Sequence, residues 1–411
     1  MLNLKRTLVV GSFWTLFGQF GYLSITLFAN IVLARILSPS EFGQLGIVLF
    51  FIVIARVLTE SGLGGALVRN NNASDVDYST IFIFNLVVSV FLCLLLISFS
   101  GYIADFYKDQ SLKQLLIASS FILIINAFQF VQSAKLVKQM RFKQKAIYEF
   151  IAILIAAIVG VILALKNFGV WSLVFMQLLT AMMLTLLLWF FEGGHGAFKF
   201  NKKSFKFHYK FGINTTLASI INAVFDNAYQ VILGKYFTIA QTGLYYQAKK
   251  LQDLPTGVIN QLTQGLLFSV LSKIQDDEVR FRETYQGIIR FFTVIVGFIS
   301  LILYVFAKEI IMLLLGEQWI EATFFLQSLS IVGFFYMQEM FNRILFKVYN
   351  DTSYILYLEI MKKGIQLISI FIGLYANNIK VLIYGYIISS VLSYFINYYF
   401  VQKKYSFLGI N

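Results

Sequence analysis

An arginine and a glutamate lie one helical turn apart near the middle of an otherwise apolar stretch. The stretch runs from Phe42 to Leu67, and Arg56 and Glu60 within it project from the same helix face. A charge at the centre of a bilayer costs at least about 2.5–3.5 kcal/mol, so such residues usually line a protein interior or a water-filled cavity. One interpretation is a polar route through a membrane, where the guanidinium binds a phosphate through paired hydrogen bonds. The other is an internal ion pair that fixes helix packing.

A second apolar stretch, Phe211 to Leu233, contains a carboxylate in the same way. Its Asp226 could bind a coupling proton or cation. It could also accept hydrogen bonds from Asn222 and Asn227, and the residues alone leave both roles open.

The following apolar stretch contains two lysines, an aspartate and a proline. Lys249 and Asp253 repeat the four-residue spacing of the first pair, and Lys250 is adjacent. Either lysine could bind a phosphate or extend its amine toward the headgroups. Pro255 removes a backbone hydrogen bond and is expected to kink its helix, as helices near transporter substrate paths often are.

The elements that position these residues are membrane helices. Of 411 residues, 59% are hydrophobic and only 13% are charged, against about 25% in soluble proteins. Long Leu-, Ile- and Phe-rich runs with two prolines favour helices over an outer-membrane barrel. The sequence predicts an all-α integral membrane protein with about twelve transmembrane helices, at 8–34, 42–68, 79–104, 114–134, 147–165, 169–191, 211–234, 244–270, 287–306, 322–342, 354–375 and 379–401.

The net charge of +13 is explained by membrane topology. Most Lys and Arg outside the spans fall in alternate loops, which the positive-inside rule assigns to the cytoplasm. We therefore expect a multi-pass protein of the bacterial inner (plasma) membrane, with both termini cytoplasmic and no nucleic-acid partner.

An internal repeat divides the chain. Residues 31–43 align without gaps with residues 231–243, and Leu33 and Gly43 are identical to Leu233 and Gly243. Both copies connect the first and second helices of a half, so we predict two six-helix lobes related by a pseudo-two-fold axis along the membrane normal. The predicted lobes are residues 1–191 and 211–411. A basic cytoplasmic linker, 192–210, joins them along the anionic leaflet.

Several motifs resemble bacterial polysaccharide (oligosaccharide) flippases of the multidrug/oligosaccharidyl-lipid/polysaccharide exporter superfamily. The most specific is Ala-Arg-x-Leu-Ser-Pro-x-Glu-Phe-Gly at residues 34–43. Others lie at 62–68, 226–227, 233–235, 243–246, 254–255 and 315–319. The resemblance implies two six-helix lobes around a central cavity. It also implies export of undecaprenyl-diphosphate-linked oligosaccharide to the outer leaflet by alternating access, for O-antigen, capsule or exopolysaccharide synthesis.

In this interpretation Arg56, Lys249 and Lys250 bind the diphosphate, while Glu60, Asp226 and Asp253 are cavity anions or ion-coupling groups. The expected partners are lipid-linked oligosaccharide and membrane lipids, together with a polysaccharide polymerase and glycosyltransferases. No cofactor is expected, and coupling to H⁺ or Na⁺ stays open.

Two alternatives remain: a cation-coupled drug or small-molecule antiporter of the same superfamily, and a membrane-embedded sugar polymerase. The chain has no phosphate-binding Gly-x-x-x-x-Gly-Lys loop, no Gly-x-Ser-x-Gly elbow and no metal-ligand spacing. A polymerase would normally need a sizeable extramembrane loop for its acid and base groups, and no predicted loop is long enough. We therefore predict that the protein is not an enzyme and binds no metal.

Overall fold

The computed structural model describes residues 2–60, 63, 67, 73–193 and 199–406 of the chain. These residues form helices joined by short turns, and none of them is in a strand. The chain divides into two compact units, Met1–Lys235 and Tyr236–Asn411.

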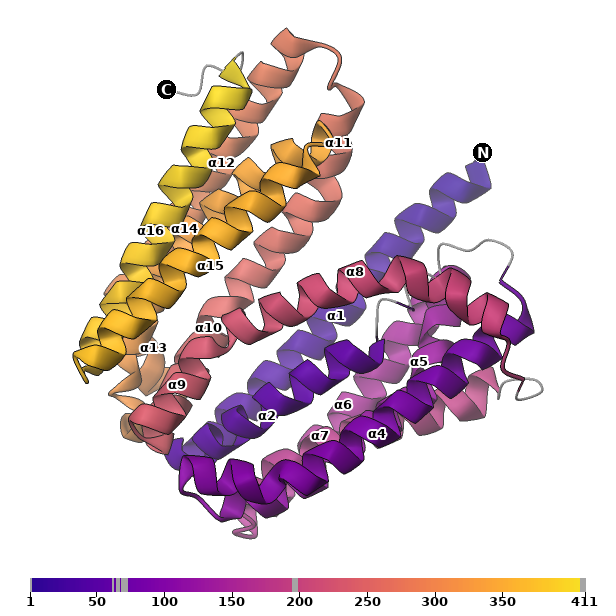
Figure 1. Ribbon diagram of the computed structural model, residues 1–411, viewed down its shortest axis with the longest axis vertical. Helices are drawn as coiled ribbons and strands as arrows, with labels where there is room; N and C mark the ends of the chain where they lie inside the picture. The colour runs from indigo at the N-terminus through magenta and orange to yellow at the C-terminus, as the bar shows by residue number, and fades with distance from the viewer. Residues whose placement is uncertain (1, 61–62, 64–66, 68–72, 194–198, 407–411) are drawn as a thin grey trace. The chain divides into compact units, whose positions relative to one another are not determined.

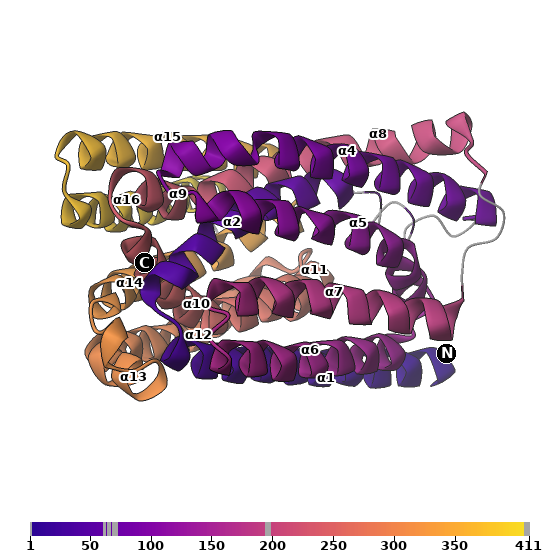
Figure 2. The same ribbon diagram turned by 90° about the horizontal axis from the view of Figure 1, so that it is seen from below.

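Unit 1 is built from long helices that lie side by side (Figures 1 and 2). Helix α5 packs against α2, α4 and α7, and α6 packs against both α1 and α7. Helix α8 packs on α2 and α4. The helices are α1 (Leu2–Ile36), α2 (Pro39–Glu60), α4 (Asp75–Tyr107), α5 (Ser111–Lys138), α6 (Phe142–Leu165), α7 (Val170–Glu192), α8 (Lys202–Asp226) and α9 (Ala228–Tyr236), the last reaching the first residue of unit 2.

Unit 2 repeats much of this packing. Its central helix α14 contacts α10, α12 and α16, as α5 contacts α2, α4 and α7, and α15 packs on α16 as α6 packs on α7. The elements are α10 (Ile239–Leu262), the π-helical turn η1 (Thr263–Leu267), α11 (Phe268–Lys273), α12 (Glu278–Val305), α13 (Ala307–Leu314), the 3₁₀ turn η2 (Glu317–Trp319), α14 (Ala322–Val348), α15 (Thr352–Tyr375) and α16 (Ile379–Lys404).

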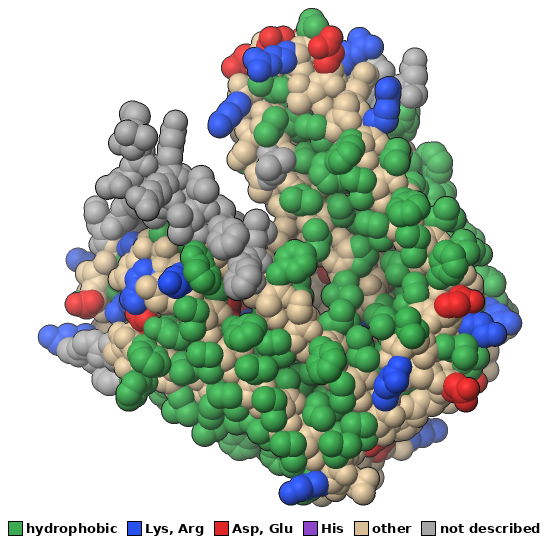
Figure 3. Space-filling model, turned by 180° about the vertical axis from the view of Figure 1, so that it is seen from behind, with side chains coloured by type: hydrophobic (Ala, Val, Ile, Leu, Met, Phe, Trp, Pro, Cys, Tyr) green, Lys and Arg blue, Asp and Glu red, His purple; other side chains and the backbone are tan. Residues whose placement is uncertain are grey.

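The helical prediction is confirmed, because each predicted span overlaps a helix. Eight of the described helices are long and apolar enough to cross a membrane: Gly18–Ile36 of α1, α2, α4, α5, α6, α7, α12 and α16. Hydrophobic side chains cover most of the surface seen in Figure 3, and charged ones gather mainly toward its margins. The chain is therefore an all-α, multi-pass membrane protein.

Two predicted segments differ from the structure. The span predicted at 211–234 is interrupted between α8 and α9, because Asn227 leaves helical geometry and its side chain donates to the Ala223 carbonyl at 2.8 Å. Residues 202–210 of the predicted linker form the start of α8, because the Asn201 side chain caps this helix by accepting from the amides of Lys203 and Ser204. Residues 194–198 of that linker lie outside the described residues. The compact units divide after Lys235, and the lobe boundaries drawn from the repeat stay a prediction.

The repeated segment has the same local structure in both copies. The first helix ends at Ile36 and at Tyr236, and the next begins at Pro39 and at Ile239. Ser38 and Thr238 cap these second helices by accepting from the amides of Glu41 and Gln241, at 3.4 and 3.1 Å. The sequence repeat is thus a repeated helix–turn–helix corner.

Candidate functional site

Helix α2 is fixed at its first turn. The Glu41 carboxylate accepts from the backbone amide and hydroxyl of Ser38 at 2.7 and 2.8 Å, which completes a capping box. A Cβ added at Gly169, in the α6–α7 turn, would lie 2.6 Å from Glu41 Oε1, so a larger residue there would have to displace the carboxylate. The Gln44 amide donates to Asp109 Oδ2 at 2.7 Å and ties α2 to the α4–α5 turn. These contacts set the position of the charged pair farther along α2.

Arg56 and Glu60 form the ion pair expected from their spacing. Arg56 Nε lies 2.7 Å from Glu60 Oε1, and the two side chains are 60% and 46% exposed. A second four-residue pair lies on α6, where Lys145 Nζ is 2.5 Å from Glu149 Oε1. Tyr22 of α1 lies within electrostatic range of both Arg56 and Glu149. The other side chains of unit 1 thus leave the Arg56–Glu60 pair largely exposed, although α2 is apolar enough to span a membrane.

The predicted residues of α10 share one part of that helix. Lys249 and Lys250 are half-buried and Asp253 is exposed, one turn after Lys249. The Lys250 amine lies 5.9 Å from the centre of the Tyr246 ring, which is a cation–π distance. The structure therefore places the predicted residues of α10 close together on that helix. It also places Arg56 and Glu60 together, on α2.

Pro255 lies inside α10 without ending it. The Thr256 hydroxyl donates to the Gln252 carbonyl at 3.1 Å beside it. Helical hydrogen bonding changes farther on, at the π-helical turn η1, and π-turns often mark functional sites. The kink expected at Pro255 stays a prediction, and no pattern in the sequence predicts η1.

Asp226 is the exposed last residue of α8, directly before the interruption at Asn227. Its carboxylate thus stands at a helix break, a position that discontinuous membrane helices use to hold ions. Its expected role in ion coupling stays a prediction.

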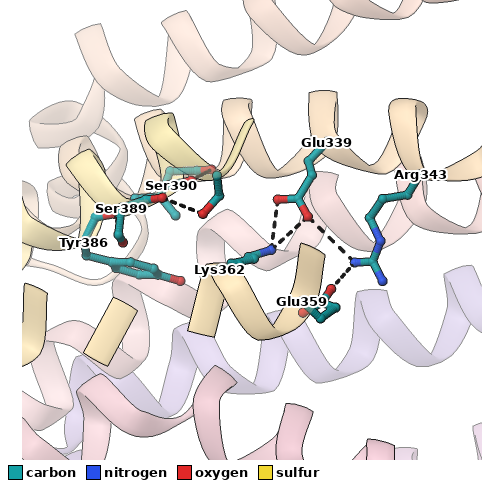
Figure 4. Close-up of polar contacts among 9 residues, drawn as sticks. Glu339, Arg343, Glu359, Lys362, Tyr386, Ser389 and Ser390 are labelled. Carbon is teal, nitrogen blue, oxygen red and sulfur yellow. Dashed lines mark hydrogen bonds and ion pairs between the residues drawn. The ribbon is translucent and has the colours of Figure 1, made fainter. Parts of the chain in front are cut away.

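An ion network built around the buried Glu339 joins α14 to α15, and none of its residues is among the predicted site residues (Figure 4). Lys362 Nζ lies 2.9 and 3.2 Å from the two carboxylate oxygens of Glu339, which is 4% exposed. Arg343 Nη1 lies 2.5 Å from Glu359 Oε1 and 3.9 Å from Glu339 Oε1. The four side chains form a chain of alternating charge, Lys362–Glu339–Arg343–Glu359.

The signal for this network was present in the sequence. Glu339 and Arg343 have the four-residue spacing of Arg56 and Glu60. The predicted span ends at residue 342, whereas α14 continues to Val348, so Arg343 lies beyond the predicted span and inside the observed helix. Pairing between two helices cannot be read from spacing along either one.

The described residues contain no cluster of metal-ligating side chains. Among the described residues, no group of three or more His, Cys, Asp or Glu side chains could hold an ion. The expectation that the protein binds no metal or cofactor stays a prediction.

The chain matches known proteins in sequence and in fold. A family model described as a polysaccharide biosynthesis protein matches residues 32–324. The chain belongs to this family. It is 24% identical over 309 residues to the succinoglycan biosynthesis transport protein ExoT of Rhizobium meliloti, covering 75% of this chain and 63% of that one. The match thus spans less than two thirds of that relative.

Two solved structures share the fold. The lipid II flippase MurJ in an inward closed conformation has a TM-score of 0.72 at 15% identity, over 96% of this chain and 87% of that one. An inward-facing multidrug resistance MATE family transporter of the MOP superfamily has a TM-score of 0.69 at 15% identity, over 95% of each chain. At this identity the likeness shows the fold alone.

Proposed function

We propose that the protein is a flippase that moves an undecaprenyl-diphosphate-linked oligosaccharide from the cytoplasmic to the outer leaflet by alternating access. The observation that carries the proposal is the uncovered Arg56–Glu60 pair on a membrane helix. Arg56 and Glu60 lie in the last turns of α2, Pro39–Glu60, and in the proposal this end of α2 lines water because charged groups that faced hydrocarbon would be costly. A diphosphate and its sugars need such a hydrated route, and family membership supplies the substrate class.

The cations of this route have a direct role in the proposal. Arg56 binds the diphosphate through its two-pronged guanidinium, and Lys249 and Lys250 add positive charge. Glu60, Asp226 and Asp253 moderate this charge or bind a coupling ion, H⁺ or Na⁺. Bending of α10 at Pro255, or of the chain at η1 after the end of α10, would accompany opening of the route.

The proposed arrangement is twelve spans in two six-helix lobes, in the bacterial inner membrane with both termini cytoplasmic. The common corner at residues 31–43 and 231–243 supports the two lobes, and the distribution of Lys and Arg supports the orientation. A polysaccharide polymerase and glycosyltransferases act after and before this step, because the substrate must be built and then used.

A cation-coupled antiporter is the second candidate, favoured by the fold shared with the MATE transporter. The charge of the route separates the two candidates. A diphosphate needs a route with net positive charge, whereas a cationic drug needs a negative one.

The test is export of surface polysaccharide in a host whose own copy of the gene is deleted. Wild-type protein should restore export, Arg56→Ala should abolish it at normal protein level, and Arg56→Lys should restore part of it because charge survives without the guanidinium fork. Arg280→Ala, an exposed arginine at the start of α12, is the matched control and should export normally. Recovery of export in Arg56→Ala/Glu60→Ala would show that Arg56 only neutralises Glu60, and would refute the phosphate-binding role.

A further inference from the structure

A groove of about 820 Å³ opens between α5, α6 and α7 of unit 1. Its walls are almost wholly apolar, and each helix contributes side chains from one face. On α5 the groove runs from Gln114 to Ile125, and on α7 it runs from Trp171 to Met182. None of the charged residues considered above lines it.

The groove follows the first half of α5 and of α7. Gln114 and Trp171 lie in the first turns of α5 and α7, and tryptophan is typical of the headgroup level. From there the groove extends eleven residues along each helix, which is about 16 Å. One leaflet of hydrocarbon is about 15 Å thick. All three helices are long and apolar enough to cross a membrane. The groove therefore has the depth of a single leaflet.

We infer that this groove holds the isoprenoid tail of the transported lipid in the leaflet at the Gln114 end. The inference rests on the proposed function. While the sugar head crosses a hydrated route, the tail must stay in hydrocarbon, and an apolar groove of one-leaflet depth receives it. The amide of Gln114 and the Trp171 ring stand where the chain joins its polar head. In the orientation proposed above, this is the outer leaflet, which receives the product.

Photo-crosslinking distinguishes a tail site from ordinary lipid contact. Phe121 lines the groove and is 47% exposed, while Phe99 of α4 is 52% exposed and lies outside the groove. A photoreactive phenylalanine is placed at either position in purified protein. The protein is reconstituted in phosphatidylethanolamine/phosphatidylglycerol vesicles that contain undecaprenyl phosphate, and adducts are identified by mass. We expect the ratio of isoprenoid to phospholipid adducts to be several-fold higher at Phe121. Equal ratios at the two positions would overturn the inference.

A second experiment fills the groove with a larger side chain and measures polysaccharide export. Ala118→Trp places a large ring in the groove, and Leu94→Trp places the same ring on the exposed face of α4. Ala118→Trp should lower polysaccharide export and isoprenoid crosslinking several-fold, and Leu94→Trp should change neither. Full export by a folded Ala118→Trp variant would refute the tail site while leaving the flippase proposal intact. Failure of wild-type protein to restore export would refute the flippase, and the vesicle crosslinking would still decide whether the groove binds isoprenoid.

Discussion

The buried network between α14 and α15 predicts a large and asymmetric response to substitution. Glu339→Gln would leave the Lys362 ammonium buried without the carboxylate that now lies 2.9 Å away. Removal of one partner of a buried pair costs about 3–5 kcal/mol. Glu359 also attracts Lys362 electrostatically and would still neutralise part of its charge, so we expect the lower end, about 3 kcal/mol. That loss corresponds to a more than hundredfold fall in the folding equilibrium constant.

Removing both partners should restore most of the stability. Glu339→Gln/Lys362→Met replaces the pair by an uncharged amide and an apolar chain, a change that is often tolerated. We expect the double variant to lose about 1 kcal/mol or less. Its loss should therefore be smaller than the sum of the two single losses by about 2 kcal/mol or more in a double-mutant cycle. Glu283→Gln, on an exposed turn of α12, is the matched control and should lie within about 0.5 kcal/mol of wild type.

The assay is reversible unfolding in mixed micelles, followed by the fluorescence of Trp319. This residue is fully buried and is the one tryptophan in the sequence of unit 2, so Trp→Phe changes at the other three leave a local probe. A loss below about 1 kcal/mol in Glu339→Gln would refute the reasoning, because it would mean that water reaches the network. A double variant as unstable as the sum of the single variants would also refute it, since the two charges would then be independent.

Three further predictions concern the ends of the helices. Ser38→Ala should destabilise unit 1 by about 1 kcal/mol in thermal unfolding, because it removes the α2 cap, whereas Ser40→Ala should have little effect. Burial raises the pKa of the Asp351 carboxyl, but hydrogen bonds from Lys404 and Tyr405 outweigh this and hold the pKa below its ordinary value of 3.8. The contact therefore stabilises the protein above about pH 4 and is lost as pH falls through the lower folded-state pKa, so the melting temperatures of Asp351→Asn and wild type should converge in acid. In a Cys93→Ser background, cysteines at the exposed Lys166 and Lys202 should label from opposite sides of the membrane, and labelling of both from outside would contradict the proposed topology.

The helices could be predicted from the sequence because apolar runs of sufficient length have few other structures in a membrane. The Arg56–Glu60 pair could be predicted as well, since both residues belong to one helix and spacing alone places them on one face. The repeated corner was visible because its caps, Ser38 and Thr238, keep a hydroxyl at the same offset.

Features that depend on contacts between helices could not be predicted in this way. The Glu339–Lys362 pair joins α14 to α15, and no pattern within either helix requires it. The interruption at Asn227 lies within the run that is predicted as one span, 211–234, and a single side-chain-to-backbone hydrogen bond marks it. The groove between α5, α6 and α7 results from the spacing of three helices, which hydropathy does not record.

The break between α8 and α9 makes the two copies of the duplicated corner mechanically different. In the first copy, α1 continues without interruption through Thr26 and Leu27, and in the second the equivalent residues are Asp226 and Asn227. A continuous helix transmits a tilt along its whole length, whereas a broken one lets its two parts tilt separately. The helix of the first copy is therefore expected to tilt as one body, whereas α8 and α9 of the second copy can tilt independently.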